Sequence, residues 1–154
     1  MMRMIVIFLA TAAYTGFVPL APGTAGSVVG LVLAWSLLGW AGAHHWLAIA
    51  AFGAAFVAGC WIAGRAEAVL GRHDSSHIVV DEVMGMVATM FLNPLDRLHL
   101  AIGFVLFRVF DIVKVFPASL IDRRVRGGTG VMLDDLAAAV YANIALRFVA
   151  HLIV

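Results

Sequence analysis

Charged residues are scarce in this sequence. Only 12% of its 154 residues are Asp, Glu, Lys or Arg, while 64% are hydrophobic and the mean hydropathy is +1.04. A soluble domain averages about 25% charged and about 45–50% apolar residues. The composition therefore excludes an ordinary soluble domain and predicts a single membrane-embedded domain over residues 1–154.

Cysteine and clustered basic residues are equally rare. The single Cys60 lies in an apolar run, which excludes an internal disulfide and favours a buried small side chain. The net charge is +1 and there is no basic run, so nothing indicates a nucleic-acid partner. The apolar residues 4–18 follow Arg3 without a convincing cleavage site, so we expect a retained re-entrant or interfacial helix.

Five further apolar segments predict an all-α bundle of about five spanning or partly spanning helices. Two of them are short and have charged ends, which is typical of helices that line a polar cavity in a membrane protein. If each segment crosses once, the distribution of arginines places three connections on the cytoplasmic side. The segments are 28–43, 46–64, 79–92, 98–110 and 131–154, and the cytoplasmic connections are 18–27, 65–82 and 111–135.

The few acidic residues are concentrated in one part of the chain. Seven of the nine lie between Asp81 and Asp135, interleaved with arginines and the lysine at 114. A charge at the centre of a membrane costs about 3 kcal/mol, so such residues usually face one another, water or a ligand. Carboxylates combined with cations indicate a divalent metal and a phosphorylated ligand held at a membrane surface.

Two motifs carry the first part of this pattern. A Pro- and Gly-rich stretch predicts a loop that opens a helix, where Gly23 bares backbone N–H groups and Thr24 or Ser27 binds an anion or caps the helix. The second motif contains Asp81 and Glu82. Adjacent residues on a helix point about 100° apart, so one acid could cap the helix start while the other binds metal.

Two later motifs complete the pattern. Arg108, Asp111 and Lys114 share one helical face, either as a ladder of salt bridges or as a metal ligand flanked by phosphate-binding cations. A glycine-rich turn then leads to Asp134 and Asp135 at a predicted helix entrance. Paired aspartates supply the hard oxygen ligands that Mg²⁺ prefers, whereas a helix cap needs only one.

In order and spacing, from about residue 15 to 140, these motifs resemble the phosphatidylglycerophosphatase A family of lipid phosphatases in bacterial inner membranes. One departure is Val115, because the family has proline directly after the motif lysine; Pro117 follows two residues later. The matching stretches are 22–27, 73–74, 78–86, 107–114, 122–123 and 127–135.

The resemblance implies Mg²⁺-dependent hydrolysis of phosphatidylglycerophosphate to phosphatidylglycerol and phosphate, at the cytoplasmic face of a multi-pass inner-membrane protein surrounded by membrane lipids. The residue types are compatible with this chemistry, since carboxylates can hold Mg²⁺ and cations can clamp phosphate oxygens. We expect metal ligation by Asp81, Glu82, Asp111, Asp134 and Asp135; phosphate binding by Gly23, Thr24, Ser27, Arg108, Lys114 and Arg123; and catalytic roles for Asp81, Arg108, Asp111 and Lys114.

Three alternatives stand beside this interpretation. An aspartate could act as a covalent nucleophile, although the sequence has no Asp-x-Asp-x-Thr motif. A cation transporter or channel also places carboxylates among membrane helices, but more often at mid-membrane and without so many paired cations. A cytidine-diphosphate alcohol phosphotransferase would carry a signature of aspartates, glycines and arginine that is absent here.

Overall fold

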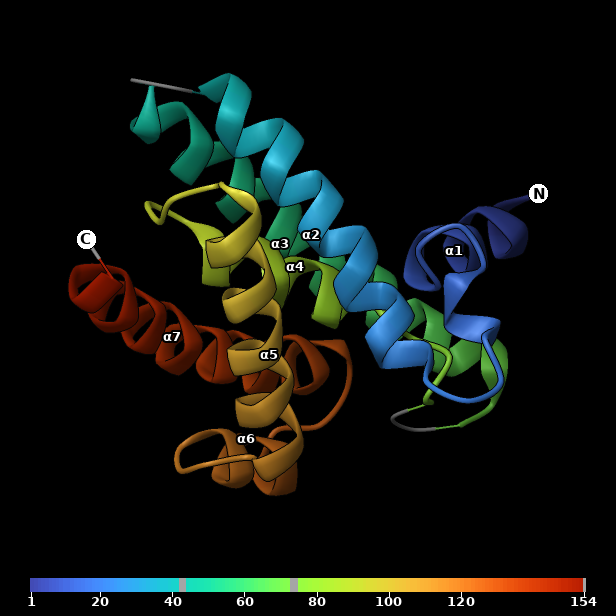
Figure 1. Ribbon diagram of the computed structural model, residues 1–154. Coiled ribbons are helices and arrows are strands. Elements are labelled where there is room, and N and C mark those ends of the chain that lie inside the picture. Colours follow the sequence, from blue (N-terminus) through green and yellow to red (C-terminus); the bar gives the residue numbers. More distant parts are fainter. Residues whose placement is uncertain (42–43, 73–74, 154) are drawn as a thin grey trace.

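The computed structural model describes residues 1–41, 44–72 and 75–153. These residues form seven α-helices and one short 3-10 helix, η1, with no strand among them, which confirms the predicted all-α fold (Figure 1). The helices are α1 Met2–Ala10, η1 Thr15–Phe17, α2 Pro22–Ala41, α3 His45–Leu70, α4 Val80–Met90, α5 Arg97–Val113, α6 Ala118–Arg124 and α7 Gly128–Ile153.

Three of the described helices, α2, α3 and α7, are long and apolar enough to cross a membrane. With its 11 residues, α4 rises only about 16 Å, and α5 with 17 residues rises about 25 Å, against a hydrocarbon core of about 30 Å. The nine-residue α1 is shorter still. The lengths agree with the predicted mixture of full and partial spans and with a short N-terminal helix.

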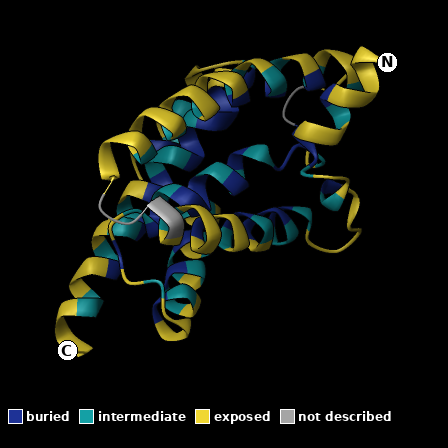
Figure 2. Cartoon of the chain, turned by 90° about the horizontal axis from the view of Figure 1, so that it is seen from above, coloured by how far each residue is buried: buried dark blue, intermediate teal, exposed yellow. Residues whose placement is uncertain are grey.

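The outer surface of the bundle carries many large apolar side chains, as a surface in contact with lipid requires. On α7, Val140, Ile144 and Phe148 repeat every four residues and are all exposed, whereas Ala138 and Ala142 on the other face are buried. Figure 2 shows exposed residues along the outer faces of the helices and buried ones between the helices. The helices therefore present large side chains to lipid and small ones to each other. Small residues at the contacts let helix backbones approach closely, which drives association where no hydrophobic effect operates between helices.

Glycine contacts hold α4 in the middle of the bundle. A Cβ atom at Gly30 of α2 would lie 2.6 Å from the carbonyl oxygen of Val83, and one at Gly85 would lie 2.5 Å from the ring of Phe107 in α5. Real Cβ atoms do not come so close. Helix α4 is therefore packed backbone-to-backbone against α2 and in direct contact with a ring of α5.

The helices alternate in direction, which gathers the charged connections at one end. Gly64 near the end of α3 lies beside Gly128 at the start of α7, and Lys114 at the end of α5 bonds Asp134 near the start of α7. We call this the site end; it contains the starts of α2, α4 and α7 and the ends of α3 and α5. The described residues of connections 18–27, 65–82 and 111–135 meet there, at one end of the bundle as the sequence predicts.

Several predicted boundaries were wrong by about two turns. Helix α2 begins at Pro22, because proline at the first helical position lacks only an N–H that the helix does not need. Helix α3 continues to Leu70 and ends at Gly71 in the left-handed conformation, a common helix stop. The short α6 was not predicted. The motif residues 73–74 lie outside the described residues.

The N-terminal segment supports the start of α4 from the side. The backbone N–H of Val79 donates to the carbonyl of Ala10 at 2.9 Å, and Nδ1 of His77 is hydrogen-bonded with the carbonyl of Gly16 at 3.0 Å. The ring of Phe17 packs on the ring of His77, with centroids 4.7 Å apart. These contacts fix the chain just before the acidic pair of α4.

Candidate active site

A cavity of about 360 Å³ opens at the site end. Its lining contains six carboxylates and one cation, drawn from helices α4, α5, α6 and α7 and from the residue that ends α5. Far apart in the sequence, these charges come together because the helices that carry them begin or end at the same level. The charged lining residues are Asp81, Glu82, Asp111, Lys114, Asp122, Asp134 and Asp135.

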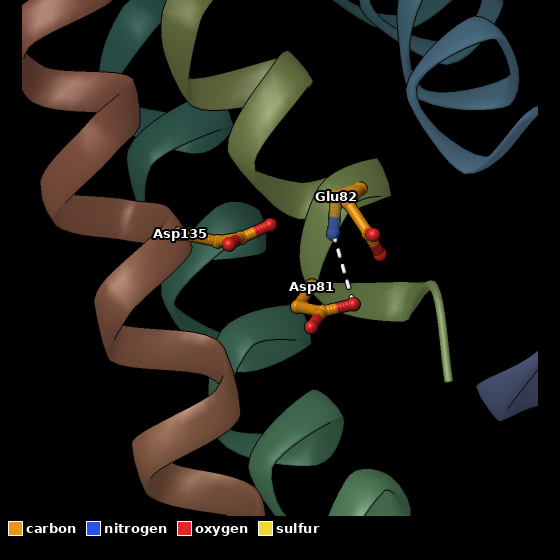
Figure 3. A group of neighbouring side chains, drawn as sticks. All are labelled: Asp81, Glu82 and Asp135. Atoms are coloured by element: carbon orange, nitrogen blue, oxygen red, sulfur yellow. Dashed lines mark hydrogen bonds between the residues drawn. The ribbon is translucent and has the colours of Figure 1, made fainter. Parts of the chain in front are cut away.

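Asp81, Glu82 and Asp135 form the centre of this cavity. Each offers one carboxylate oxygen to a group whose members all lie within 4.8 Å of one another (Figure 3). Asp81 and Asp135 are buried, and Glu82 is half-buried. Asp81 also accepts a hydrogen bond of 3.1 Å from the backbone N–H of Glu82. Both neighbours on α4 thus face the same cavity, although they are adjacent in the sequence.

Three carboxylate oxygens in the site lack a hydrogen-bond partner among the described residues. They are Oε2 of Glu82, Oδ1 of Asp134 and Oδ2 of Asp135, and all three are buried. A buried charged acceptor without a partner is costly, so such groups normally pair or coordinate a metal. Hard carboxylate oxygens without a Cys or His in the group suit Mg²⁺, Mn²⁺ or Ca²⁺. The donor set therefore fits a divalent cation.

Lys114 joins three helices at the edge of the cavity. It ends α5 with its backbone in the left-handed conformation, φ +46°. Its Nζ donates to Asp122 at 2.5 Å and to Asp134 at 2.7 Å. Partial burial acts to lower the pKa of Lys114, but the two carboxylates outweigh it and raise the pKa above its ordinary value. The side chain therefore carries a positive charge beside the cavity.

Arg108 and the start of α2 form the wall behind Glu82. Arg108 Nη1 donates to Asp111 Oδ2 at 2.7 Å, as the predicted ladder requires, and also to Ser27 Oγ at 3.4 Å. Ser27 does not cap α2, because its hydroxyl donates to the Gly23 carbonyl one turn earlier, at 2.8 Å. A Cβ atom at Gly23 would overlap the Glu82 carboxylate, so the first turn of α2 lies directly against it.

The remaining sequence predictions divide into three groups. Asp134 and Asp135 lie in the second turn of α7 and not at its entrance, because the glycine-rich turn is already helical from Gly128. Thr24 is half-buried and Arg123 exposed, and neither lines the cavity formed by the described residues. The sequence pattern points to Arg123, whereas the structure places its neighbour Asp122 in the lining. The reason is the unpredicted α6, which determines that Asp122 faces Lys114.

The similarity of this chain to known proteins shows its family. The model of the phosphatidylglycerophosphatase A family matches residues 8–150. The chain belongs to this family. The predicted resemblance is confirmed, and the chain is a lipid phosphatase of the membrane, which favours the enzyme over the transporter alternative.

Curated relatives agree over most of the chain. It is 37% identical over 139 residues to phosphatidylglycerophosphatase A of Haemophilus influenzae, covering 90% of this chain and 84% of the relative. The Escherichia coli protein of the same name is 33% identical over 144 residues, covering 93% and 82%. A Bacteroides thetaiotaomicron relative, provisionally named a phosphatidylinositol-3-phosphatase, is 35% identical over 146 residues, covering 91% and 90%. No solved structure matches.

Proposed function

We propose that this chain hydrolyses the phosphomonoester of phosphatidylglycerophosphate in a Mg²⁺-dependent reaction at the cytoplasmic face of the inner membrane, releasing phosphatidylglycerol and phosphate. The observation that carries the proposal is the triad of Asp81, Glu82 and Asp135 with its unpartnered oxygens, in a cavity that also contains Lys114. Carboxylates alone would repel a phosphate. A divalent cation among them would let the cavity accept one.

In the proposed site, Asp81, Glu82 and Asp135 hold the cation, with Asp111 and Asp134 at its border. When bound, the ion supplies charge neutralisation at the phosphate oxygens and a water molecule of lowered pKa. The Lys114 ammonium stabilises the negative charge that the phosphoryl group develops in the transition state.

The first turn of α2 and Arg108 complete the proposed phosphate site. Gly23 and Thr24 lie at a helix N-terminus, whose free backbone N–H groups favour an anion. Gly23 lies against both Glu82 and Arg108, so an anion bound at this turn would be near the cation site. Arg108 holds Asp111 in place through their ion pair. It also places a second positive charge beside Gly23.

Phosphate release from lipid substrates in detergent micelles tests the reaction. We expect release from phosphatidylglycerophosphate with Mg²⁺, loss of release with EDTA, and recovery when Mg²⁺ is restored. Phosphatidylinositol-3-phosphate is the comparison substrate, because one relative is named for it. Full activity in exhaustively chelated enzyme would remove the metal from the proposal, and a preference for the inositol lipid would change the substrate.

Labelling of single cysteines tests the sidedness. In a Cys60→Ala background, Thr129→Cys at the site end is expected to react only with reagents that reach the cytoplasm. His45→Cys, at the start of α3 and at the other end of the bundle, is expected to react from the outside. The prediction rests on the arginines at 72, 123, 124 and 126, which gather at the site end. The reverse labelling pattern would invert the topology.

A further inference from the structure

The end of α4 that lies away from the cavity is tied to α7 by side chains that no motif includes. Asn143 Nδ2 donates to three carbonyls of α4 and the residue after it: Ala88 at 3.2 Å, Thr89 at 2.9 Å and Phe91 at 2.8 Å. Arg147 Nη2 donates to the same Phe91 carbonyl at 3.2 Å. Arg147 Nε also donates to Asn143 Oδ1 at 3.0 Å and so orients the amide.

These bonds satisfy the backbone carbonyls that the short helix α4 leaves without a partner at its end. The last carbonyls of a helix have no partner within it, and inside a membrane bundle there is little water to supply one. Because α4 has only 11 residues, its last turn ends within the bundle. We call Asn143 and Arg147, with the carbonyls that they bind, the α4–α7 clamp.

The clamp lies in register with the proposed metal site. Thr89 lies eight positions after Asp81 on α4, and Asn143 lies eight positions after Asp135 on α7. Both intervals correspond to a rise of about 12 Å, so the two helices run parallel and in step. Gly85 lies midway between Asp81 and Thr89 on α4. A Cβ atom at Gly85 would lie 3.4 Å from the carbonyl oxygen of Asp135 on α7. The two helices are thus in contact from the carboxylates to the clamp.

We propose that Asn143 and Arg147 are positioning residues for the carboxylate triad, which they hold together by fixing α4 against α7. The proposal rests on the metal site proposed above. Asp81 and Glu82 come from α4 and Asp135 from α7, so the distances between these ligands depend on how far one helix slides along the other. A displacement of about 1 Å is enough to disrupt a catalytic geometry. The clamp is the polar contact that opposes this sliding.

The test measures metal binding apart from turnover. The melting temperature of the purified protein in detergent is followed as Mg²⁺ is added, for the wild type, Asn143→Leu, Arg147→Met and Asp96→Ala. Asn143→Leu removes the donors at similar side-chain size, and Arg147→Met is the milder variant because Arg147 is exposed. Asp96→Ala is the matched control, since it removes the N-cap of α5 at the same end of the bundle and touches neither the clamp nor the cavity.

We expect Asn143→Leu to raise the Mg²⁺ concentration at the midpoint of the melting-temperature increase by about tenfold, the lower end of the effect of groups bonded directly to metal ligands, because Asn143 acts on the ligands through the two helices. Arg147→Met is expected to raise the same midpoint by a smaller factor. Asp96→Ala should lower the melting temperature at neutral pH and leave the midpoint unchanged. The Mg²⁺ dependence of phosphate release should follow the same order.

The outcomes separate the two proposals. If Mg²⁺ does not stabilise the wild type at all, the proposed metal site fails and the positioning role fails with it. If Mg²⁺ stabilises the wild type but Asn143→Leu and Arg147→Met both keep its midpoint, only the positioning role is wrong. Should Asn143→Leu not fold, an unchanged midpoint in Arg147→Met overturns the inference by itself.

Discussion

The two ends of the α4–α7 pair differ in how many of their buried polar groups have a hydrogen-bond partner. At the site end, Glu82 and Asp135 each keep a buried carboxylate oxygen without a partner, while at the other end Asn143 gives hydrogen bonds to three carbonyls. Unpartnered buried atoms exist there too, on Asn93 and His99, but neither is a carboxylate oxygen. A charged group left without a partner costs far more than a neutral one.

This difference indicates which end is built to bind. An end whose backbone groups are satisfied by the protein has little to gain from a ligand, so its contacts contribute stability. An end with unpartnered carboxylates is less stable by itself and gains from any cation that enters. Substitutions at the two ends should therefore change stability in opposite directions: loss of a site carboxylate should raise it, and loss of a clamp donor should lower it.

The largest expected effect comes from Asp135→Asn. Turnover should fall by about 10³-fold, because a buried ligand of the triad loses its charge. In metal-free detergent, however, the variant should melt at a higher temperature than the wild type, because one of several close like charges is removed. Mg²⁺ titrations of phosphate release and of melting temperature check both parts. A lower melting temperature of this variant in EDTA would contradict the inference that unpartnered carboxylates make the site end less stable.

Lys114→Ala is expected to lower turnover by about 10²-fold and to leave the Mg²⁺ midpoint nearly unchanged, because it removes a charge that acts on the transition state. Lys114→Arg, which keeps the charge, should retain part of the activity. Single-turnover phosphate release at several Mg²⁺ concentrations makes the measurement.

Asp111→Asn is the contrasting variant for Lys114, since part of its defect should be rescued by high Mg²⁺. The two residues have different partners, Arg108 for Asp111 and Asp122 and Asp134 for Lys114, so their effects should differ. If both variants keep wild-type turnover at every Mg²⁺ concentration, this part of the cavity is structural.

A smaller effect is expected from Gly23→Ala, with Gly39→Ala on the same helix as its control. The new methyl group at 23 would overlap the Glu82 carboxylate, so activity should fall by about tenfold, equal to about 1.4 kcal/mol in the barrier. At Gly39 the nearest atom is 4.0 Å from the added Cβ, so activity should not change. Equal activities in the two variants would show that the first turn of α2 does not border the site.

The smallest effect is expected from Asp96→Ala, which removes the N-cap of α5 away from the cavity. Slight desolvation acts to raise the pKa of Asp96, but its bonds with His99 and with two backbone N–H groups outweigh it and lower the pKa. Its stabilising effect is therefore present above its ordinary pKa of about 3.9 and is lost as the pH falls through the lower folded-state value.

The measurement for Asp96→Ala is the melting temperature as a function of pH. The variant should melt below the wild type at neutral pH, and the difference should shrink in acid. Phosphatase activity at temperatures well below melting should be unchanged. A loss of turnover would mean that the N-cap of α5 also serves the chemistry.

Much of the site was predictable because its residues occur in compact motifs. Asp81 and Glu82, Asp111 and Lys114, and Asp134 and Asp135 are rare charges in an apolar chain, and each such charge needs a partner or a ligand. The alternation of helix direction then places their motifs at one end. What the pattern could not show was the pairing: Lys114 belongs with Asp122 and Asp134, and not with Asp111 one turn earlier on the same face. It leaves that face because its backbone turns left-handed as the helix ends.

The amino-acid sequence by itself determined the membrane bundle, its approximate number of helices and the family, since these follow from composition and from residues close together in the chain. Only the tertiary structure decided that both Asp81 and Glu82 reach Asp135, that Asp122 and not Arg123 borders the cavity, and that Asn143 holds the far end of α4. Each of these depends on the rotation and register of one helix against another. Packing of small residues sets both, and no local pattern of charge or hydrophobicity records them.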